Sequence, residues 1–203
     1  MSTLIQVSNL KKRYGSFEVL QDISFAGSAG ECVCFTGRNG CGKSTLLSLI
    51  AGVDRPDGGE IVFAGGRIRR GYLPQANPLI LSASVRDNLN LWCADKKQLM
   101  AAADRFDLAS ILKKRVSKLS GGMKRRVALA CAMASDPRIL IMDEPTAGLD
   151  IEYKESIRKE MREHMDRGGL LIMVSHEAEE IRLSENPFLL DEGILKPYIG
   201  SLS

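Results

Sequence analysis

The segment Gly37–Thr45 constrains the fold of this chain more than any other part of its sequence. It reads Gly-Arg-Asn-Gly-Cys-Gly-Lys-Ser-Thr and fits the phosphate-binding pattern G-x-x-x-x-G-K-S/T. Glycines at these spacings let successive backbone N–H groups converge on phosphate oxygens, because no Cβ atom stands in the way. The apolar run Glu31–Thr36 precedes the loop, and Ser44–Ala51 has the spacing of a helix. A strand, a glycine-rich loop and a helix in this order predict an α/β core that binds phosphate groups.

Two side chains of this loop have a direct chemical use at a nucleotide. Lys43 is placed to reach the β- and γ-phosphates, and the Ser44 hydroxyl is placed to ligate Mg²⁺. The helix that begins near Ser44 adds the positive end of its dipole. The residues expected to bind the phosphates are Gly37, Arg38, Asn39, Gly40, Cys41, Gly42, Lys43, Ser44 and Thr45. The alternative interpretation is a plain glycine turn.

A second motif, Ile139–Glu144, supplies carboxylates. Four apolar residues followed by two acids describe a buried strand that ends at the ligand-binding edge of a parallel sheet. Asp143 would hold Mg²⁺ through water, and Glu144 would polarise the water that attacks the γ-phosphate. The alternative is a pair of acids that only caps the end of a strand.

The remaining pattern predicts a doubly wound α/β core with a helical insertion. Strand-like segments at Ile139–Met142 and Leu170–Val174 flank the charged helical segment Ile151–Arg167, which implies parallel strands joined by helical crossovers. The first 30 residues predict short strands around a turn at Tyr14–Ser16. Between Ser84 and Ala134 the apolar spacing is mostly helical and nothing resembles a strand.

Composition excludes several classes of protein. The chain has 203 residues, of which 44% are apolar and 26% charged, and these values exclude a disordered tail, a collagenous rod and a disulfide miniprotein. A net charge of +3 and 5% aromatic residues oppose a nucleic-acid-binding surface, so no nucleic-acid partner is expected. We interpret two basic triplets, 113–115 and 124–126, as solvated helix faces rather than RNA contacts.

The cysteines and the apolar runs indicate the cellular compartment in which the chain functions. We predict that all five cysteines, none of them in a CxxC pair, are reduced thiols, and that Cys32 and Cys34 share one face of a strand. The apolar residues near the start precede the first basic ones, which is the reverse of a signal peptide. No run approaches the roughly 18 apolar residues that a membrane span requires. A role at a membrane would therefore need a separate partner chain.

The segment Leu119–Arg126 distinguishes this chain from other proteins with the same two motifs. Its sequence, Leu-Ser-Gly-Gly-Met-Lys-Arg-Arg, lies before the Asp143 strand and resembles the signature sequence of the ATP-binding-cassette (ABC) ATPases. Further residues stand where that family would place its motifs. They are Tyr14 as the aromatic that stacks on adenine, Gln75 in the Q-loop, Asp150 in the D-loop and His176 as the switch histidine. The resemblance extends from about Leu4 to Asp191.

The resemblance implies a fold and a set of cofactors. The implied fold class is α/β: a P-loop NTPase core with a mostly parallel sheet, an N-terminal antiparallel β subdomain and an inserted α-helical subdomain at about 76–135. All of it would belong to one nucleotide-binding domain spanning 1–203. The implied cofactors are ATP and Mg²⁺, with the metal held by Ser44, Gln75 and Asp143. The implied catalytic residues are Glu144, His176 and Gln75.

The family also implies a head-to-tail dimer, as a homodimer or with a related ATPase chain. Ser120, Gly121 and Gly122 of one subunit would close over ATP bound by the other, and Asp150 would belong to the same composite site. The alternative for Ser120–Gly122 is an ordinary helix-capping turn. His176 has the alternative of a structural histidine, and Tyr14 that of packing in a hairpin. For Gln75 the alternative is a surface residue after a proline.

Two residues depart from or add to the family pattern. Met123 ends the signature where the family usually has Gln, which puts in doubt only the contact made by that last position. Cys41 lies inside the phosphate loop, and we expect its alkylation to block ATP binding and ATP to protect it. The alternative for Cys41 is a small residue that simply fits the loop.

The function expected from the resemblance is an ATP-hydrolysing subunit that powers transport through a separate membrane permease. Such a subunit would be cytoplasmic and peripheral on the inner face of the cell membrane. Apolar residues after Gln75, within 76–92, are expected either to line a groove for a partner helix or to pack in the core. The alternative function is a soluble ABC-type ATPase in translation, repair or cofactor assembly. A phosphotransferase is a third class, but the sequence shows no acceptor pocket for one.

Overall fold

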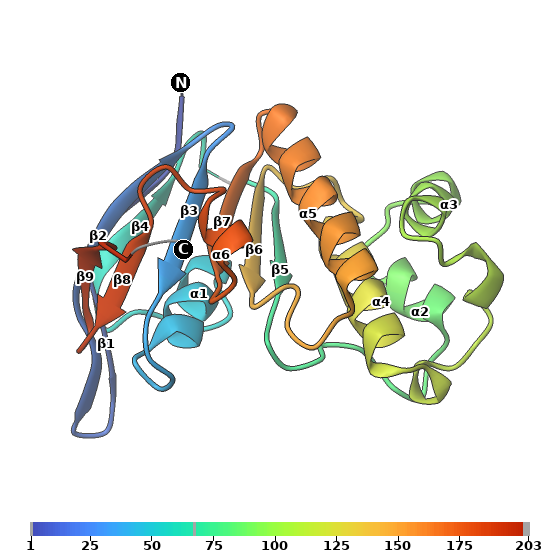
Figure 1. Ribbon diagram of the computed structural model, residues 1–203, viewed down its shortest axis with the longest axis horizontal. Coiled ribbons are helices and arrows are strands. Elements are labelled where there is room, and N and C mark those ends of the chain that lie inside the picture. Colours follow the sequence, from blue (N-terminus) through green and yellow to red (C-terminus); the bar gives the residue numbers. More distant parts are fainter. Residues whose placement is uncertain (1, 67, 201–203) are drawn as a thin grey trace.

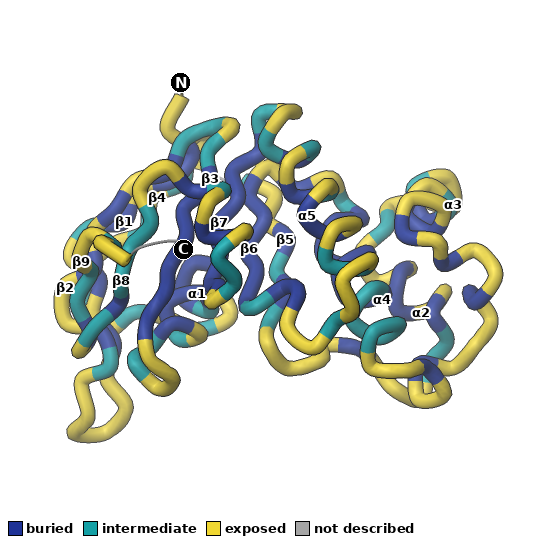
Figure 2. Tube along the Cα trace, viewed as in Figure 1, coloured by how far each residue is buried: buried dark blue, intermediate teal, exposed yellow. Residues whose placement is uncertain are grey.

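The computed structural model describes residues 2–66 and 68–200 and builds one nine-stranded sheet in the order β4-β1-β2-β9-β8-β3-β7-β6-β5 (Figure 1). Four neighbouring strands of this sheet are parallel: β3 (Cys32–Thr36), β7 (Leu170–Val174), β6 (Ile139–Asp143) and β5 (Arg70–Leu73). All residues of β3, β6 and β7 are buried, as the dark strands in Figure 2 show. Continuous apolar runs of this kind are typical of parallel strands covered on both faces.

Antiparallel strands form the other end of the sheet. The first hairpin joins β1 (Thr3–Tyr14) to β2 (Phe17–Ser28), and β4 (Gly58–Phe63) pairs with the free edge of β1. Both hairpin strands are 12 residues long, so the expectation of short strands in this region is wrong. Register shifts along β1 interrupt the alternation of buried and exposed side chains, and that alternation is the signal by which a long strand is recognised.

A short hairpin near the end of the chain connects the two parts of the sheet. It consists of β8 (Phe188–Asp191) and β9 (Ile194–Pro197), which the sequence did not predict. Strand β8 runs parallel to β3, while β9 bridges to β2 at Asp22. Four-residue strands carry too few positions for a period to be recognised.

Alternate residues of the central strands point into two separate cores. Val33 and Phe35 pack with helix α1 (Lys43–Ala51), while Cys32 and Cys34 pack on the opposite face of the sheet. The prediction that these two cysteines share one face is confirmed. That second core contains α4 (Gly121–Met133) and one side of α5 (Ile151–Asp166). Helices cover both faces of the parallel strands, as a doubly wound sheet requires.

The helical segment predicted between Ser84 and Ala134 contains three α-helices. In addition to α4 it holds α2 (Val85–Asn90) and α3 (Lys96–Arg105), with two 3-10 turns, η1 (Ala109–Ile111) and η2 (Val116–Lys118), between α3 and α4. Figure 1 shows α2 and α3 at the end of the molecule farthest from β1 and β2. A short helix, α6 (Ala178–Ile181), follows β7.

Among the described residues, no helix is both long enough and apolar enough to cross a membrane. All five cysteines are free thiols, as predicted.

Candidate functional site

The loops that follow β3, β5, β6 and β7 meet at one edge of the sheet, because the strands are parallel neighbours. A pocket of about 470 Å³ opens at this edge. Its lining residues are Tyr14, Val19, Asn39, Gly40, Gly42, Lys43, Ser44, Thr45, Gln75, Asp143 and Glu144. The structure therefore brings residues from five separate sequence segments into one pocket, and the sequence had singled out every one of them except Val19.

The phosphate loop encloses the Lys43 ammonium. Lys43 Nζ donates to the carbonyl oxygens of Gly37 at 2.7 Å and Arg38 at 2.9 Å, and its side chain is buried. Gly37 has a φ of 146°, and a Cβ atom there would lie 2.3 Å from the Leu190 carbonyl oxygen. Only glycine fits that position. The loop is thus shaped by its own glycines and by contact with the end of β8.

Helix α1 presents an uncompensated N-terminus to the pocket. Its N-cap is Gly42, whose φ of 106° is left-handed and which has no side chain to cap the helix. No acidic residue occupies the first turn, which begins with Lys43, Ser44 and Thr45. Free N–H groups and the positive end of the helix dipole therefore face the pocket, an arrangement that binds anions such as phosphate.

Asp143 lies at the floor of the pocket with only 2% of its surface exposed. Burial raises the pKa of its carboxyl group, and a hydrogen bond from Ser44 opposes that shift. The Oδ2 atom is buried and has no hydrogen-bond partner among the residues that the structure describes. An unpaired carboxylate oxygen beside a serine hydroxyl is a donor set that fits Mg²⁺, which prefers oxygen ligands. Occupation by a cation would remove the cost of burying this charge.

Gln75 and His176 converge on Glu144. Gln75 Nε2 donates to Glu144 Oε2 at 3.4 Å, and His176 Nε2 lies 3.7 Å from Glu144 Oε1. Glu144 is in the left-handed region, with φ 47°, directly after β6, and its N–H donates to the Val174 carbonyl at 3.0 Å. A non-glycine residue in this region is strained, and such strain is concentrated at functional sites. The loops after β5, β6 and β7 thus bring the three expected catalytic residues together.

Tyr14 lines the pocket from the end of β1 and is 52% exposed. Its hydroxyl donates to Asp54 at 2.8 Å, and Lys12 Nζ donates to the same carboxylate at 2.9 Å. These two hydrogen bonds, with that from Lys12 the stronger influence, lower the pKa of Asp54 to about 2. The cluster fixes the ring at the mouth of the pocket while leaving much of it accessible.

The signature residues do not line the phosphate pocket of their own chain. Ser120 is the N-cap of α4, and its Oγ accepts from the Met123 N–H at 3.3 Å, so the capping geometry considered as an alternative is present. Gly121 and Gly122 line a second pocket of about 330 Å³, which is bordered by Gln75 and Glu144. Gln75 and Glu144 line both pockets, so the two pockets meet at these side chains.

Asp150 also lies outside the phosphate pocket. It is exposed and forms the N-cap of α5, where its Oδ1 accepts from the Tyr153 N–H at 3.0 Å. Arg38 and Cys41 belong to the loop but do not line the pocket. Cys41 is partly buried and faces a separate recess beside Phe17.

Arg125 is a residue of the site that sequence reasoning missed. Its guanidinium donates to the carbonyl oxygens of Pro74 at 2.7 Å, Asp143 at 2.6 Å, Glu144 at 2.9 Å and Pro145 at 3.2 Å. Burial lowers the pKa of this group. One side chain on α4 therefore fastens the residue before Gln75 to the end of β6.

The interpretation of 124–126 as a solvated face is wrong for two of its three residues. Besides Arg125, Arg126 is paired with Asp107 at 3.2 Å and lies over the Tyr153 ring at 4.1 Å. Successive helical residues point about 100° apart, so three consecutive basic residues cannot share one face. The triplet 113–115 is exposed, as expected, but it lies in the turn between η1 and η2 and not on a helix.

Comparisons with known proteins agree with this geometry. Residues 20–147 match the family described as "ABC transporter". The Nod factor export ATP-binding protein I of Rhizobium etli is 37% identical over 94% of this chain. The chain spans 66% of that protein's length, and 62% of its counterpart in Rhizobium meliloti.

Solved structures show the same fold. An ATP-binding subunit of an ABC transporter superposes with a TM-score of 0.86 at 27% identity, over 95% of this chain and 88% of that one. A dimeric post-hydrolysis ATP-binding cassette bound to ADP and phosphate superposes with a TM-score of 0.87 at 24% identity. That superposition covers 96% of this chain and 98% of that one.

Proposed function

The chain belongs to the ABC transporter family, and on that premise we propose that it is the ATP-hydrolysing subunit that powers a separate membrane permease. The observation that carries the proposal is the convergence of Gln75 and His176 on Glu144 beside the phosphate loop. Phosphate-binding and water-activating groups are required together for hydrolysis. Residues 76–135 act as a helical subdomain within one nucleotide-binding domain spanning 1–203.

ATP binds across the pocket in this proposal. Loop N–H groups and Lys43 hold the phosphates, and the exposed face of Tyr14 stacks on the adenine. Ser44, Gln75 and Asp143 would hold Mg²⁺, which would neutralise the charge that develops on the phosphates. Support for the metal site comes from the unpaired Oδ2 of Asp143.

Hydrolysis depends on the position of Glu144. Its carboxylate orients and polarises the attacking water, and His176 contacts the γ-phosphate from the loop after β7. Gln75 lies between Glu144 and the helical subdomain, so its contact with the site changes when nucleotide is bound or lost. Movement of that loop is the step that we propose transmits the ATP cycle to the permease.

A second ATPase subunit completes the site. Ser120, Gly121 and Asp150 are exposed and lie outside the phosphate pocket of their own chain, which leaves them available to nucleotide bound by a partner. The dimeric cassette with the same fold supports this arrangement. Either a homodimer or a heterodimer with a related chain fits these residues.

We further propose that the subunit works at the cytoplasmic face of a membrane and that transport is directed outward. The printed name of the similar Rhizobium etli protein, an export ATP-binding protein, supports that direction.

The test is ATP turnover and nucleotide binding by the purified chain. Glu144→Gln should bind ATP with near-normal affinity, lose at least about a hundredfold in turnover and accumulate as a dimer with ATP. Lys43→Ala should instead weaken nucleotide binding itself. Wild-type protein that turns over no ATP, or a Glu144→Gln variant with near-normal turnover, would contradict the proposal. A turnover per molecule that does not fall on dilution of a strict monomer would contradict the dimer.

A further inference from the structure

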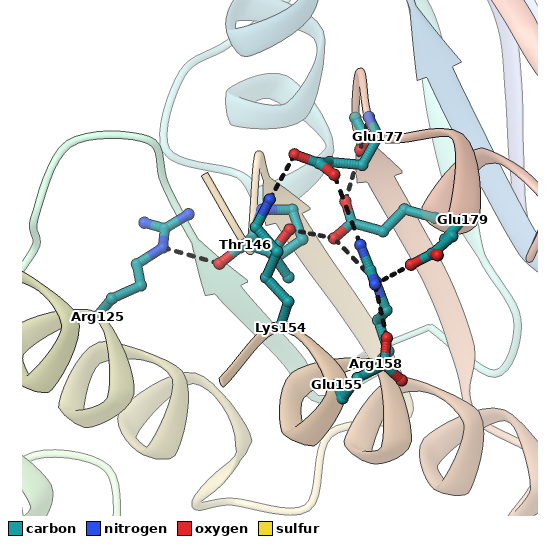
Figure 3. A network of polar contacts seen from close by, with 10 residues as sticks. Arg125, Thr146, Lys154, Glu155, Arg158, Glu177 and Glu179 are labelled. Carbon is teal, nitrogen blue, oxygen red and sulfur yellow. Dashed lines mark hydrogen bonds and ion pairs between the residues drawn. The ribbon is translucent and has the colours of Figure 1, made fainter. Parts of the chain in front are cut away.

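A buried carboxylate joins the two loops that carry Glu144 and His176. Glu180, on α6, is only 1% exposed. Its Oε1 accepts a hydrogen bond from the Thr146 hydroxyl, and its Oε2 accepts one from the Ser175 hydroxyl at 2.5 Å. Figure 3 shows the network in which Thr146 lies between the end of β6 and the residues after β7.

The positions of the two donors are specific. Thr146 is buried and lies two residues after Glu144, while Ser175 directly precedes His176. Ser175 Oγ also accepts from the Glu177 N–H at 3.0 Å, which fixes the backbone on the other side of His176. The Glu180 carboxylate therefore sets the distance between the loop after β6 and the loop after β7.

Other contacts already attach α6 and the residue before it to α5. Lys154 Nζ donates to Glu177 at 2.8 Å, and Arg158 pairs with Glu179 and, within α5, with Glu155 at 2.7 Å. Arg158 Nε lies 3.9 Å from Glu180, too far for a close hydrogen bond. Both short hydrogen bonds that Glu180 accepts come from the two loops and not from α5. A buried carboxylate is costly, and an apolar side chain would pack such a position at less cost if anchoring were all that was needed.

We propose that Glu180 is a positioning residue that holds the loops of Glu144 and His176 in register, so that the two side chains meet at the phosphate pocket. The proposal rests on the ATPase function proposed above. Glu180 acts by fixing the geometry of the site, because a displacement of about 1 Å between reacting groups is enough to lower a rate substantially.

The first test separates turnover from binding. Glu180→Gln keeps the shape of the side chain but lets only one oxygen accept, and Glu180→Ala removes both contacts. We expect kcat for ATP to fall at least about tenfold in Glu180→Ala and less in Glu180→Gln, with KM within about twofold of wild type. Glu179→Gln, on the same helix and paired with Arg158 on α5 instead of with either loop, is the matched control and should keep the wild-type kcat.

The second test asks whether Glu180 acts through His176. In a His176→Ala background, Glu180→Ala should cause no further loss of kcat, whereas a general structural defect would multiply the two losses. The chain has two histidines, of which His164 is buried far along α5, so the two ring Cε1–H NMR signals can be assigned. Glu180→Ala should shift the His176 signal and leave that of His164 unchanged.

Thr146→Val keeps the proposal testable if Glu180→Ala does not fold. This substitution removes a single hydrogen-bond donor and changes the side-chain volume little. It should reproduce the loss of kcat and the NMR shift. Unchanged kcat in a folded Glu180→Ala or Thr146→Val protein would overturn the inference, as would multiplicative losses with His176→Ala. Absence of turnover in wild type would instead count against the proposed function, while the NMR comparison would still decide whether Glu180 positions His176.

Discussion

The guanidinium of Arg125 donates to the backbone carbonyl of Glu144 at 2.9 Å, and so a side chain of the signature helix fixes the residue expected to activate water. The same Nη2 atom donates to the Asp143 carbonyl, and Nη1 reaches Pro74, directly before Gln75. This one side chain holds the end of β6 and the residue before Gln75 at a set distance from α4. The helix capped by Ser120 is therefore joined directly to the loop that carries Glu144.

Arg125→Ala should destabilise the protein and reduce ATP turnover. Four part-buried carbonyl groups would lose a charged donor, which we expect to cost about 2–4 kcal/mol in the free energy of unfolding. Chemical denaturation and steady-state ATPase rates measure the two effects. Lys113→Ala, which removes an exposed positive charge, is the control and should change neither. Wild-type stability in Arg125→Ala would show that water replaces these contacts.

Asp143→Asn should raise the stability of the nucleotide-free protein while weakening Mg²⁺-dependent ATP binding. Burial raises the pKa of Asp143 above its ordinary value of 3.8, so its contribution to stability is fully present below pH 3.8 and is lost as pH rises through the folded pKa. The neutral amide removes that loss at pH 7. A Tm higher by roughly 2–4 °C is expected in thermal unfolding. A lower Tm would mean that the carboxylate is better solvated than its burial indicates.

The Asp54 cluster should contribute to acid unfolding. The pKa of Asp54 is lowered from 3.8 to about 2, so its contribution is complete above about pH 4 and is lost as pH falls through about 2. Asp54→Asn should flatten the dependence of stability on pH between pH 4 and pH 2. Urea unfolding at several pH values measures this slope. Asp104→Asn, at an exposed position, should leave it as in wild type.

Alkylation of Cys41 should block ATP binding, and bound ATP should slow the alkylation. Cys41 faces a recess outside the phosphate pocket, but it lies between Gly40 and Gly42, which both line that pocket, so an adduct on its thiol should displace the loop. It is partly buried, whereas Cys32, Cys34 and Cys131 are buried. A Cys93→Ala background removes the other partly buried thiol. N-ethylmaleimide labelling, followed by mass spectrometry with and without ATP and Mg²⁺, measures protection. Equal labelling in both conditions would show that nucleotide does not cover this thiol.

The phosphate loop and the buried strands could be predicted because each depends on residues close together in the sequence. The glycines between Gly37 and Thr45 by themselves indicate the backbone conformation of the phosphate loop. The apolar runs of β3, β6 and β7 can be recognised as buried strands from their composition alone. The grouping of Gln75 and His176 with Glu144 was expected from the family resemblance, and the strand order of the structure brings the three to one edge of the sheet. Met123 is partly buried and packs against the core that contains α4, a contact that suits an apolar side chain.

Arg125, Glu180 and the β8–β9 hairpin were decided only by the tertiary structure. Nothing in a run of three basic residues says which of them turns inward, and nothing around Glu180 marks a carboxylate that accepts from residues 34 and 5 positions away. Such groups are chosen by long-range packing, which determines which backbone carbonyls and hydroxyls are buried without a partner. The residue types within each short motif thus determined which groups of this chain form the phosphate site. Tertiary packing decided which side chains hold those groups in place.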